Sequence, residues 1–128
     1  MAIQNIFVVG AGLMGSGIAQ NAITSGYTVT INDQRQEALD RAKAGIEKAL
    51  NRDVEKGRMA AEDRDAALAR LTLDSTLEGA RQADLVIEAI IEDLKAKQAV
   101  FASLEDICPE HTIFASNTSS ISLTALAA

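Results

Sequence analysis

Short apolar runs alternate with stretches of helical periodicity along the chain. The apolar runs occupy residues 6–9, 27–33, 71–73, 84–90 and 112–116. Nearly continuous apolar character is typical of parallel strands buried on both faces. Alternation of such strands with helices predicts an α/β fold of the Rossmann type, in which helices cover both faces of a parallel sheet.

Helical periodicity is strongest between the second and third apolar runs. Apolar residues there recur every three or four positions over 36–58, and a second helical segment follows over 62–70. Two helices between strands 2 and 3 exceed a minimal Rossmann unit, so we expect an inserted helical hairpin that projects beyond the sheet. Ser75 and Glu78 have the spacing of a capping box and predict a short helical turn.

A glycine-rich turn joins the first strand to the first helix. It consists of Gly10, Ala11, Gly12, Leu13, Met14 and Gly15. In this motif the first glycine allows the turn, the second lets the backbone approach a pyrophosphate, and the third lets the helix pack against the strand. The helix amino end then faces the anion. The alternative is a glycine turn that merely joins strand to helix.

The second strand ends in an acid, Asp33, about 20 residues beyond the glycines, as in dinucleotide-binding folds. A carboxylate there accepts hydrogen bonds from the adenosine ribose and repels a 2′-phosphate, so we expect NAD rather than NADP. Arg35 is the nearby cation that argues the other way. Alternatively, Asp33 only caps a helix.

Composition narrows the class of protein further. The 128 residues amount to one domain, and the net charge of −6 argues against nucleic acid as a partner. A single cysteine, Cys108, suits a reducing compartment, and we see neither a membrane span, nor room for a signal peptide, nor a metal site. We therefore expect a cytoplasmic domain that does not bind membranes.

Strand topology sorts the remaining polar residues. Ligands of an open parallel sheet bind at the carboxyl ends of its strands, where the glycine loop, Asp33, Glu92 and residues 117–120 should converge. His111 precedes the fifth strand, so it should lie at the opposite edge, about 15 Å away at ~3.3 Å per residue. It is therefore a poor candidate for a general base. Glu92 is also compatible with simple helix-terminus chemistry, and residues 117–120 with an ordinary turn.

Three cations share one helix face, because Lys48, Arg52 and Lys56 are spaced four residues apart. One interpretation is a solvated face with intrahelical pairs to Glu47, Asp53 and Glu55. The other is a contact for a phosphorylated substrate.

Four motifs together resemble the NAD-binding domain of 3-hydroxyacyl-CoA dehydrogenases, in particular the short-chain 3-hydroxybutyryl-CoA type. They are the glycine loop 10–15, Asp33, the segment 83–92 and the segment 116–120. The resemblance covers the chain from end to end. It implies NAD-dependent interconversion of an L-3-hydroxyacyl-CoA and its 3-ketoacyl-CoA.

The resemblance also implies roles for individual residues. Glu92 and Lys97 would lie by the nicotinamide half of NAD, and Ser119 between nicotinamide and substrate, its hydroxyl bonded to the reacting oxygen. Asn117 would join Ser119 in substrate binding, and Lys56 would meet the CoA phosphates.

The family's catalytic histidine, in a His-Phe-x-Asn-Pro motif, and its helical C-terminal dimerisation domain are not in these 128 residues. We therefore expect residues 1–128 to be an incomplete NAD-binding domain, inactive alone and part of a homodimer at full length. Two alternatives remain: another dehydrogenase, of the 3-hydroxyisobutyrate or 6-phosphogluconate type, and a non-catalytic NAD-sensing module.

The fifth strand should form an unpaired edge, since strand 6 of a Rossmann sheet would come from later residues. This strand, which includes Thr112, Ile113 and Phe114, is apolar and contains no proline or lysine. Such an edge is a template for pairing with another chain, so we expect self-association through residues 112–116.

Overall fold

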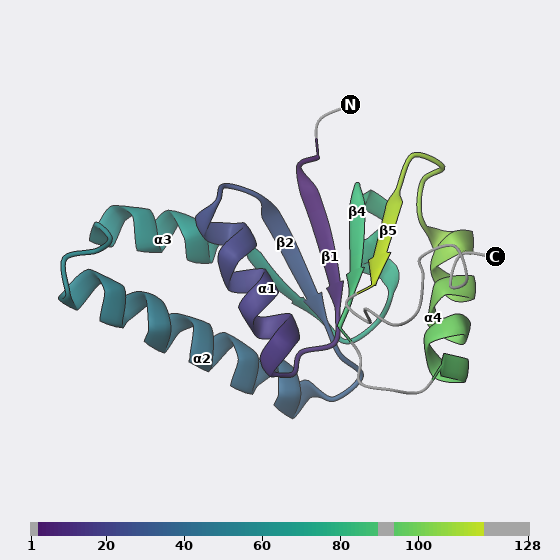
Figure 1. Cartoon of the computed structure of the whole chain (residues 1–128), viewed down its shortest axis with the longest axis horizontal. Coiled ribbons are helices and arrows are strands. Elements are labelled where there is room, and N and C mark those ends of the chain that lie inside the picture. The colour runs from purple at the N-terminus through teal and green to yellow at the C-terminus, as the bar shows by residue number, and fades with distance from the viewer. Residues whose placement is uncertain (1–2, 90–93, 117–128) are drawn as a thin grey trace.

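The computed structural model describes residues 3–89 and 94–116, without the side chains of 94–97 and 116. Five parallel strands form one sheet in the order β3-β2-β1-β4-β5 (Figure 1). Their bounds are Asn5–Val9 (β1), Thr28–Asn32 (β2), Leu71–Asp74 (β3), Leu85–Glu88 (β4) and Ile113–Ser116 (β5). The predicted Rossmann-type sheet is confirmed, and this order brings all five carboxyl ends to one edge.

Helices cover both faces of the sheet. They are α1 (Leu13–Thr24), α2 (Gln36–Glu55), α3 (Ala61–Ala69), the 3-10 helix η1 (Glu78–Gln82) and α4 (Leu94–Ile107). Alternation along β1 directs Ile6 and Val8 into a core shared with α1, α2 and α3, whereas Phe7 and Val9 face a second core that includes Leu104 of α4. The central strand β1 is therefore buried on both faces.

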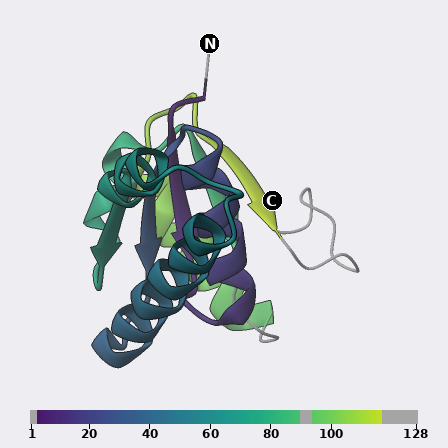
Figure 2. The ribbon, with the colours of Figure 1, turned by 90° about the vertical axis from the view of Figure 1, so that its left-hand side faces the viewer.

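The chain between β2 and β3 forms the helices α2 and α3. They lie side by side, and the turn that joins them is far from the sheet (Figures 1 and 2). Arg64 of α3 donates from Nη1 to Oδ1 of Asn51 on α2 over 3.2 Å. Helix α2 is shorter than the predicted range 36–58. It ends at Glu55 with Lys56 as its C-cap, and Gly57 follows with φ of 73°. A positive φ suits glycine, which explains why the helix ends before Arg58.

The predicted capping box at Ser75 and Glu78 is wrong. Leu77 is the N-cap of η1 and makes no side-chain capping bond. The turn is instead organised by Asp74, whose carboxylate accepts hydrogen bonds from the Thr76 N–H at 2.7 Å and the Gly79 N–H at 2.9 Å. An aspartate that bonds backbone N–H groups just after its own position is a common turn device.

Within the described part of the chain, β5 pairs with β4 alone and is an edge strand. Its two apolar side chains differ in environment. Ile113 is 55% exposed, whereas Phe114 is half-buried and meets the ring of Phe101 edge-on, with 5.6 Å between ring centroids. The apolar surface available for pairing is therefore at Ile113.

We expect the 128-residue chain to self-associate through β5, and Ile113→Lys to reduce this association by placing a charge on the exposed edge. Phe114→Lys is a poor test, because it would also remove the contact with Phe101. Size-exclusion chromatography over a concentration series measures the effect, with Tyr27→Lys, which alters an exposed aromatic outside β5, as control. A wild-type chain that elutes as a monomer at every concentration would contradict the expectation.

Candidate functional site

The glycine loop has the backbone geometry that a pyrophosphate requires. Gly10 has φ of 108°, a conformation that L side chains rarely adopt. A Cβ on Gly12 would meet no atom of the described residues within 4 Å, so they leave open space above the loop at the amino end of α1. A Cβ on Gly15 would lie 1.8 Å from the carbonyl oxygen of Gly10. The third glycine is therefore what lets α1 approach β1.

Asp33 lies directly beside this loop. Its Oδ2 accepts a hydrogen bond from the Ala11 N–H at 3.1 Å, and its Oδ1 accepts one from the Arg35 N–H at 3.0 Å. Partial burial acts to raise the pKa of this carboxyl, but the two backbone bonds and the charge of Arg35 outweigh burial and lower the pKa. Asp33 is therefore ionised at neutral pH, and Oδ2, which accepts one hydrogen bond from the described residues, keeps a lone pair for a further donor.

Arg35 is turned toward Asp33 and not toward a separate anion site. Its Nε lies 3.4 Å from Asp33 Oδ1, and its side chain is 67% exposed. An exposed pair of this kind is weak, on the order of 0–1 kcal/mol. The negative charge of Asp33 is thus only partly compensated by Arg35.

His111 lies at the opposite edge of the sheet, as expected. Its Nε2 is 2.8 Å from Oδ1 of Asp84, which precedes β4. The other carboxylate oxygen of Asp84 accepts hydrogen bonds from the N–H groups of Gln4 and Asn5, at the start of β1. These backbone bonds, with the bond to His111, lower the pKa of Asp84 to about 2. The pair joins the amino ends of β1 and β4 to the start of β5 and is structural.

Several predicted site residues lie outside the described residues. They are Glu92, Asn117 and Ser119, together with the side chain of Lys97. Their roles remain predictions. Leu13 and Met14, in contrast, are described at the amino end of α1 and are 95% and 57% exposed.

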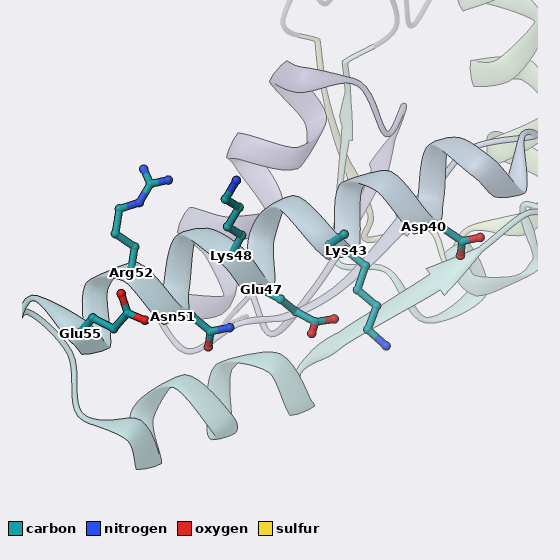
Figure 3. A pocket seen from close by; sticks show the side chains of 8 residues that line it. Asp40, Lys43, Glu47, Lys48, Asn51, Arg52 and Glu55 are labelled. Atoms are coloured by element: carbon teal, nitrogen blue, oxygen red, sulfur yellow. The ribbon is translucent and has the colours of Figure 1, made fainter.

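A hollow of about 650 Å³ lies on the outer surface of α2 (Figure 3). Lys48 and Arg52 point to the same side of the helix there, and Glu47 points to another side. Among the described residues, neither these two cations nor Lys56 makes an ion pair, and Asp53 pairs with Arg58 at 3.7 Å instead. The first interpretation, intrahelical pairs to Glu47, Asp53 and Glu55, therefore finds no such pair among the described residues. Lys56 does not line the hollow.

Sequence reasoning missed Asn32, which ends β2 and is 5% exposed. Its carbonyl accepts a hydrogen bond from the Gly10 N–H at 2.7 Å. Its side-chain nitrogen donates to the carbonyl of Asp74 at 3.0 Å and to that of Thr76. The signal in the sequence was an amide inside an otherwise apolar strand, directly before the acid.

Comparison with known proteins identifies the domain. The family model described as "3-hydroxyacyl-CoA dehydrogenase, NAD binding domain" matches residues 5–128. The chain belongs to this family. Its cofactor is NAD, and the clearance above Gly12 and the ionised Asp33 fit the pyrophosphate and the ribose of that cofactor.

Relatives agree with the family assignment. The chain is 46% identical over 128 residues to a probable 3-hydroxybutyryl-CoA dehydrogenase of Bacillus subtilis. The matched region covers 100% of this chain and 45% of that protein. It is 40% identical over 131 residues to human mitochondrial hydroxyacyl-coenzyme A dehydrogenase, covering 98% of this chain and 42% of the relative. The chain therefore spans less than half the length of these relatives.

Solved structures agree with the fold. The crystal structure of 3-hydroxybutyryl-CoA dehydrogenase from Escherichia coli has a TM-score of 0.96 at 44% identity, covering 100% of this chain and 27% of that one. A 3-hydroxyisobutyrate dehydrogenase of Mycobacterium tuberculosis has a TM-score of 0.61 at 16% identity, over 90% of this chain and 31% of that one. The second likeness shows the fold alone, so the alternative dehydrogenase class gains no support from it.

The described residues contain neither a membrane-spanning helix nor a metal-binding cluster. No helix in that part of the chain is long and apolar enough to cross a membrane. No group of three or more histidine, cysteine, aspartate or glutamate side chains within it could hold a metal ion.

Gly15→Ala should destabilise the domain by about 1–3 kcal/mol or more, because the new Cβ overlaps the Gly10 carbonyl oxygen. Gly17→Ala on the same helix is the matched control. A Cβ there meets no atom within 4 Å, so this change should stabilise the helix by roughly 0.5–1 kcal/mol. Urea denaturation measures both effects. Equal stability of the two variants would mean that α1 does not approach β1 as described.

Asp84→Asn should reduce the pH dependence of stability at acid pH. The folded pKa of about 2 is lower than the ordinary value of 3.8, so the stabilisation is present above about pH 4 and is lost as pH falls through 2. Wild type should therefore lose stability between these values, and the variant should lose less. Urea midpoints at several pH values measure this, and identical slopes would show that Asp84 is not bonded to the start of β1.

Proposed function

We propose that this chain is the cofactor-binding part of an enzyme that interconverts an L-3-hydroxyacyl-CoA, of short chain length, and its 3-ketoacyl-CoA with NAD. The observation that carries the proposal is the bond between Asp33 Oδ2 and the Ala11 N–H, which holds a ribose acceptor beside an open pyrophosphate loop. The relatives named as 3-hydroxybutyryl-CoA dehydrogenases support the substrate class.

The chemistry divides between this domain and the rest of the protein. Bound NAD would accept a hydride from C3 of the hydroxyacyl group, while the hydroxyl proton passes to a general base. We propose that the Ser119 hydroxyl forms a hydrogen bond with the reacting oxygen of the substrate. Glu92 and Lys97 would lie beside the nicotinamide half of NAD. Asn117 would support the substrate. His111 lies at the far edge of the sheet, and we propose that another part of the full-length protein supplies the base.

We propose that the cations of α2 meet the phosphates of CoA. Lys48 and Arg52 extend to one side of the helix (Figure 3). Neither side chain forms an ion pair with another described residue. Lys56 follows directly at the C-cap of α2. Unpaired cations in a protein of net charge −6 are available to an anionic ligand.

We further propose a cytoplasmic location and, for the full-length protein, a homodimer. The use of a single cysteine supports a reducing compartment. Relatives named mitochondrial in human and glyoxysomal in Brassica napus occur in the same family, so the compartment differs among its members.

The cofactor site should prefer NAD to NADP, because Asp33 would face the 2′-phosphate. Two like charges about 4 Å apart repel by roughly 1–4 kcal/mol at effective dielectrics of 80 to 20. Calorimetric titration of the chain with both nucleotides measures the difference. Asp33→Asn should reduce the difference in affinity between NAD and NADP, because it removes the charge and retains an acceptor oxygen. Equal affinities of wild type for the two nucleotides would remove the ribose role of Asp33.

The 128-residue chain alone should not reduce acetoacetyl-CoA with NADH above background, although it binds the cofactor. The full-length protein should do so, which also separates a dehydrogenase from a non-catalytic NAD-sensing module. Absorbance of NADH at saturating substrate measures both reactions. Turnover by the short chain would reveal a base within residues 1–128, and inactivity of the full-length protein would contradict the proposed function.

A further inference from the structure

Asn32 is a buried amide at the carboxyl edge of the sheet, and ribose binding at Asp33 does not account for it. It is 5% exposed, and burying an amide is costly unless its hydrogen bonds are satisfied. Its side-chain nitrogen has two hydrogens and donates to two main-chain carbonyls, those of Asp74 and Thr76. An apolar residue would satisfy the strand pattern equally well, so the amide serves these two bonds.

The two carbonyls belong to the turn that follows β3. Within this turn the Asp74 carboxylate accepts the N–H groups of Thr76 and Gly79, and the Asp74 carbonyl also accepts the Asp33 N–H at 3.2 Å. The turn is therefore fastened to the end of β2 on both sides of the Asn32–Asp33 peptide. It cannot shift without moving the ribose-binding acid.

The strand order indicates which part of a bound nucleotide would lie nearest to this turn. The pyrophosphate loop follows β1 and the ribose acid follows β2, so the dinucleotide runs along the carboxyl edge from β1 toward β2. The next strand in that direction is β3, and the segment past its carboxyl end is the turn of residues 74–79. The adenosine end of the nucleotide therefore points toward this turn.

We propose that Asn32 is a positioning residue for the adenosine half of NAD: its amide holds the 74–79 turn against β2, so that Asp33 and the turn form one rigid wall. The inference rests on the NAD site of the proposed function and adds to it a residue that touches no ligand. The asparagine side chain acts through the turn alone, since the carbonyl that accepts the Gly10 N–H belongs to the main chain and is retained whatever residue stands at position 32.

The test compares Asn32→Val with Thr112→Val. Valine is a good strand former, and at position 32 it removes both side-chain donors. Thr112 is likewise buried, at 8% exposure, and its hydroxyl donates to the Ala83 carbonyl at 2.7 Å, but it precedes β5 at the opposite edge. Both variants therefore remove buried side-chain hydrogen bonds to main-chain carbonyls, and they differ in the edge of the sheet at which they do so.

Calorimetric affinities for NAD, NADP and ADP-ribose, measured well below each melting temperature, are the readout. We expect Asn32→Val to lower the affinities for NAD and for ADP-ribose by the same factor of about ten, the equivalent of roughly one or two hydrogen bonds. The variant should also have a smaller ratio of NAD affinity to NADP affinity than the wild type. Thr112→Val should leave all three affinities unchanged. A merely structural Asn32 would lower the melting temperature and leave the affinities at wild-type values, which would overturn the proposal.

A measurement on the unmodified chain covers the case in which Asn32→Val does not fold. In amide NMR spectra, ADP-ribose should shift the signals of Thr76 and Gly79, whereas nicotinamide mononucleotide should not. Unchanged signals with ADP-ribose bound would overturn the role of the turn while leaving the NAD site intact. A wild-type chain that binds neither NAD nor ADP-ribose would instead overturn the cofactor site, and this proposal with it.

Discussion

Two hydrogen bonds donated by backbone N–H groups join the glycine loop to the end of β2, and the proposed cofactor site depends on them. The Gly10 N–H donates to the Asn32 carbonyl at 2.7 Å, and the Ala11 N–H donates to the Asp33 carboxylate at 3.1 Å. Through them the separation between the glycine loop, our proposed pyrophosphate site, and Asp33, our proposed ribose acid, is set by the protein's own hydrogen bonds. Such preorganisation lowers the cost of ordering that binding would otherwise carry.

Much of this arrangement could be predicted from the sequence because it follows from strong local rules. Gly10 is favoured by its φ of 108°, and Gly15 is required by the close approach of α1 to β1, since a Cβ on Gly15 would lie 1.8 Å from the Gly10 carbonyl oxygen. The position of His111 followed from chain direction alone, since a residue before a parallel strand lies at the amino edge. The sheet order followed from the Rossmann pattern.

The features that sequence reasoning missed depend on contacts between distant segments. Asn32 looked like an interruption of an apolar strand, and its meaning appears only when β3 brings Asp74 and Thr76 beside it. Likewise, Ser75 and Glu78 had the spacing of a capping box, but the Glu78 N–H donates to the hydroxyl of Thr76, and the Asp74 carboxylate organises the rest of the turn. Residue spacing also did not determine which charged side chains of α2 form ion pairs. Asp53 pairs with Arg58, which lies beyond the end of the helix.

The most direct test of the central claim is a crystal structure of the chain with NAD. The account predicts the pyrophosphate over Gly12 at the amino end of α1, the adenosine ribose hydroxyls on Asp33, and the adenine on the side of the 74–79 turn. The nucleotide would then run along the carboxyl edge from β1 toward β3. NAD seated in the hollow on α2, or with its ribose away from Asp33, would contradict the account.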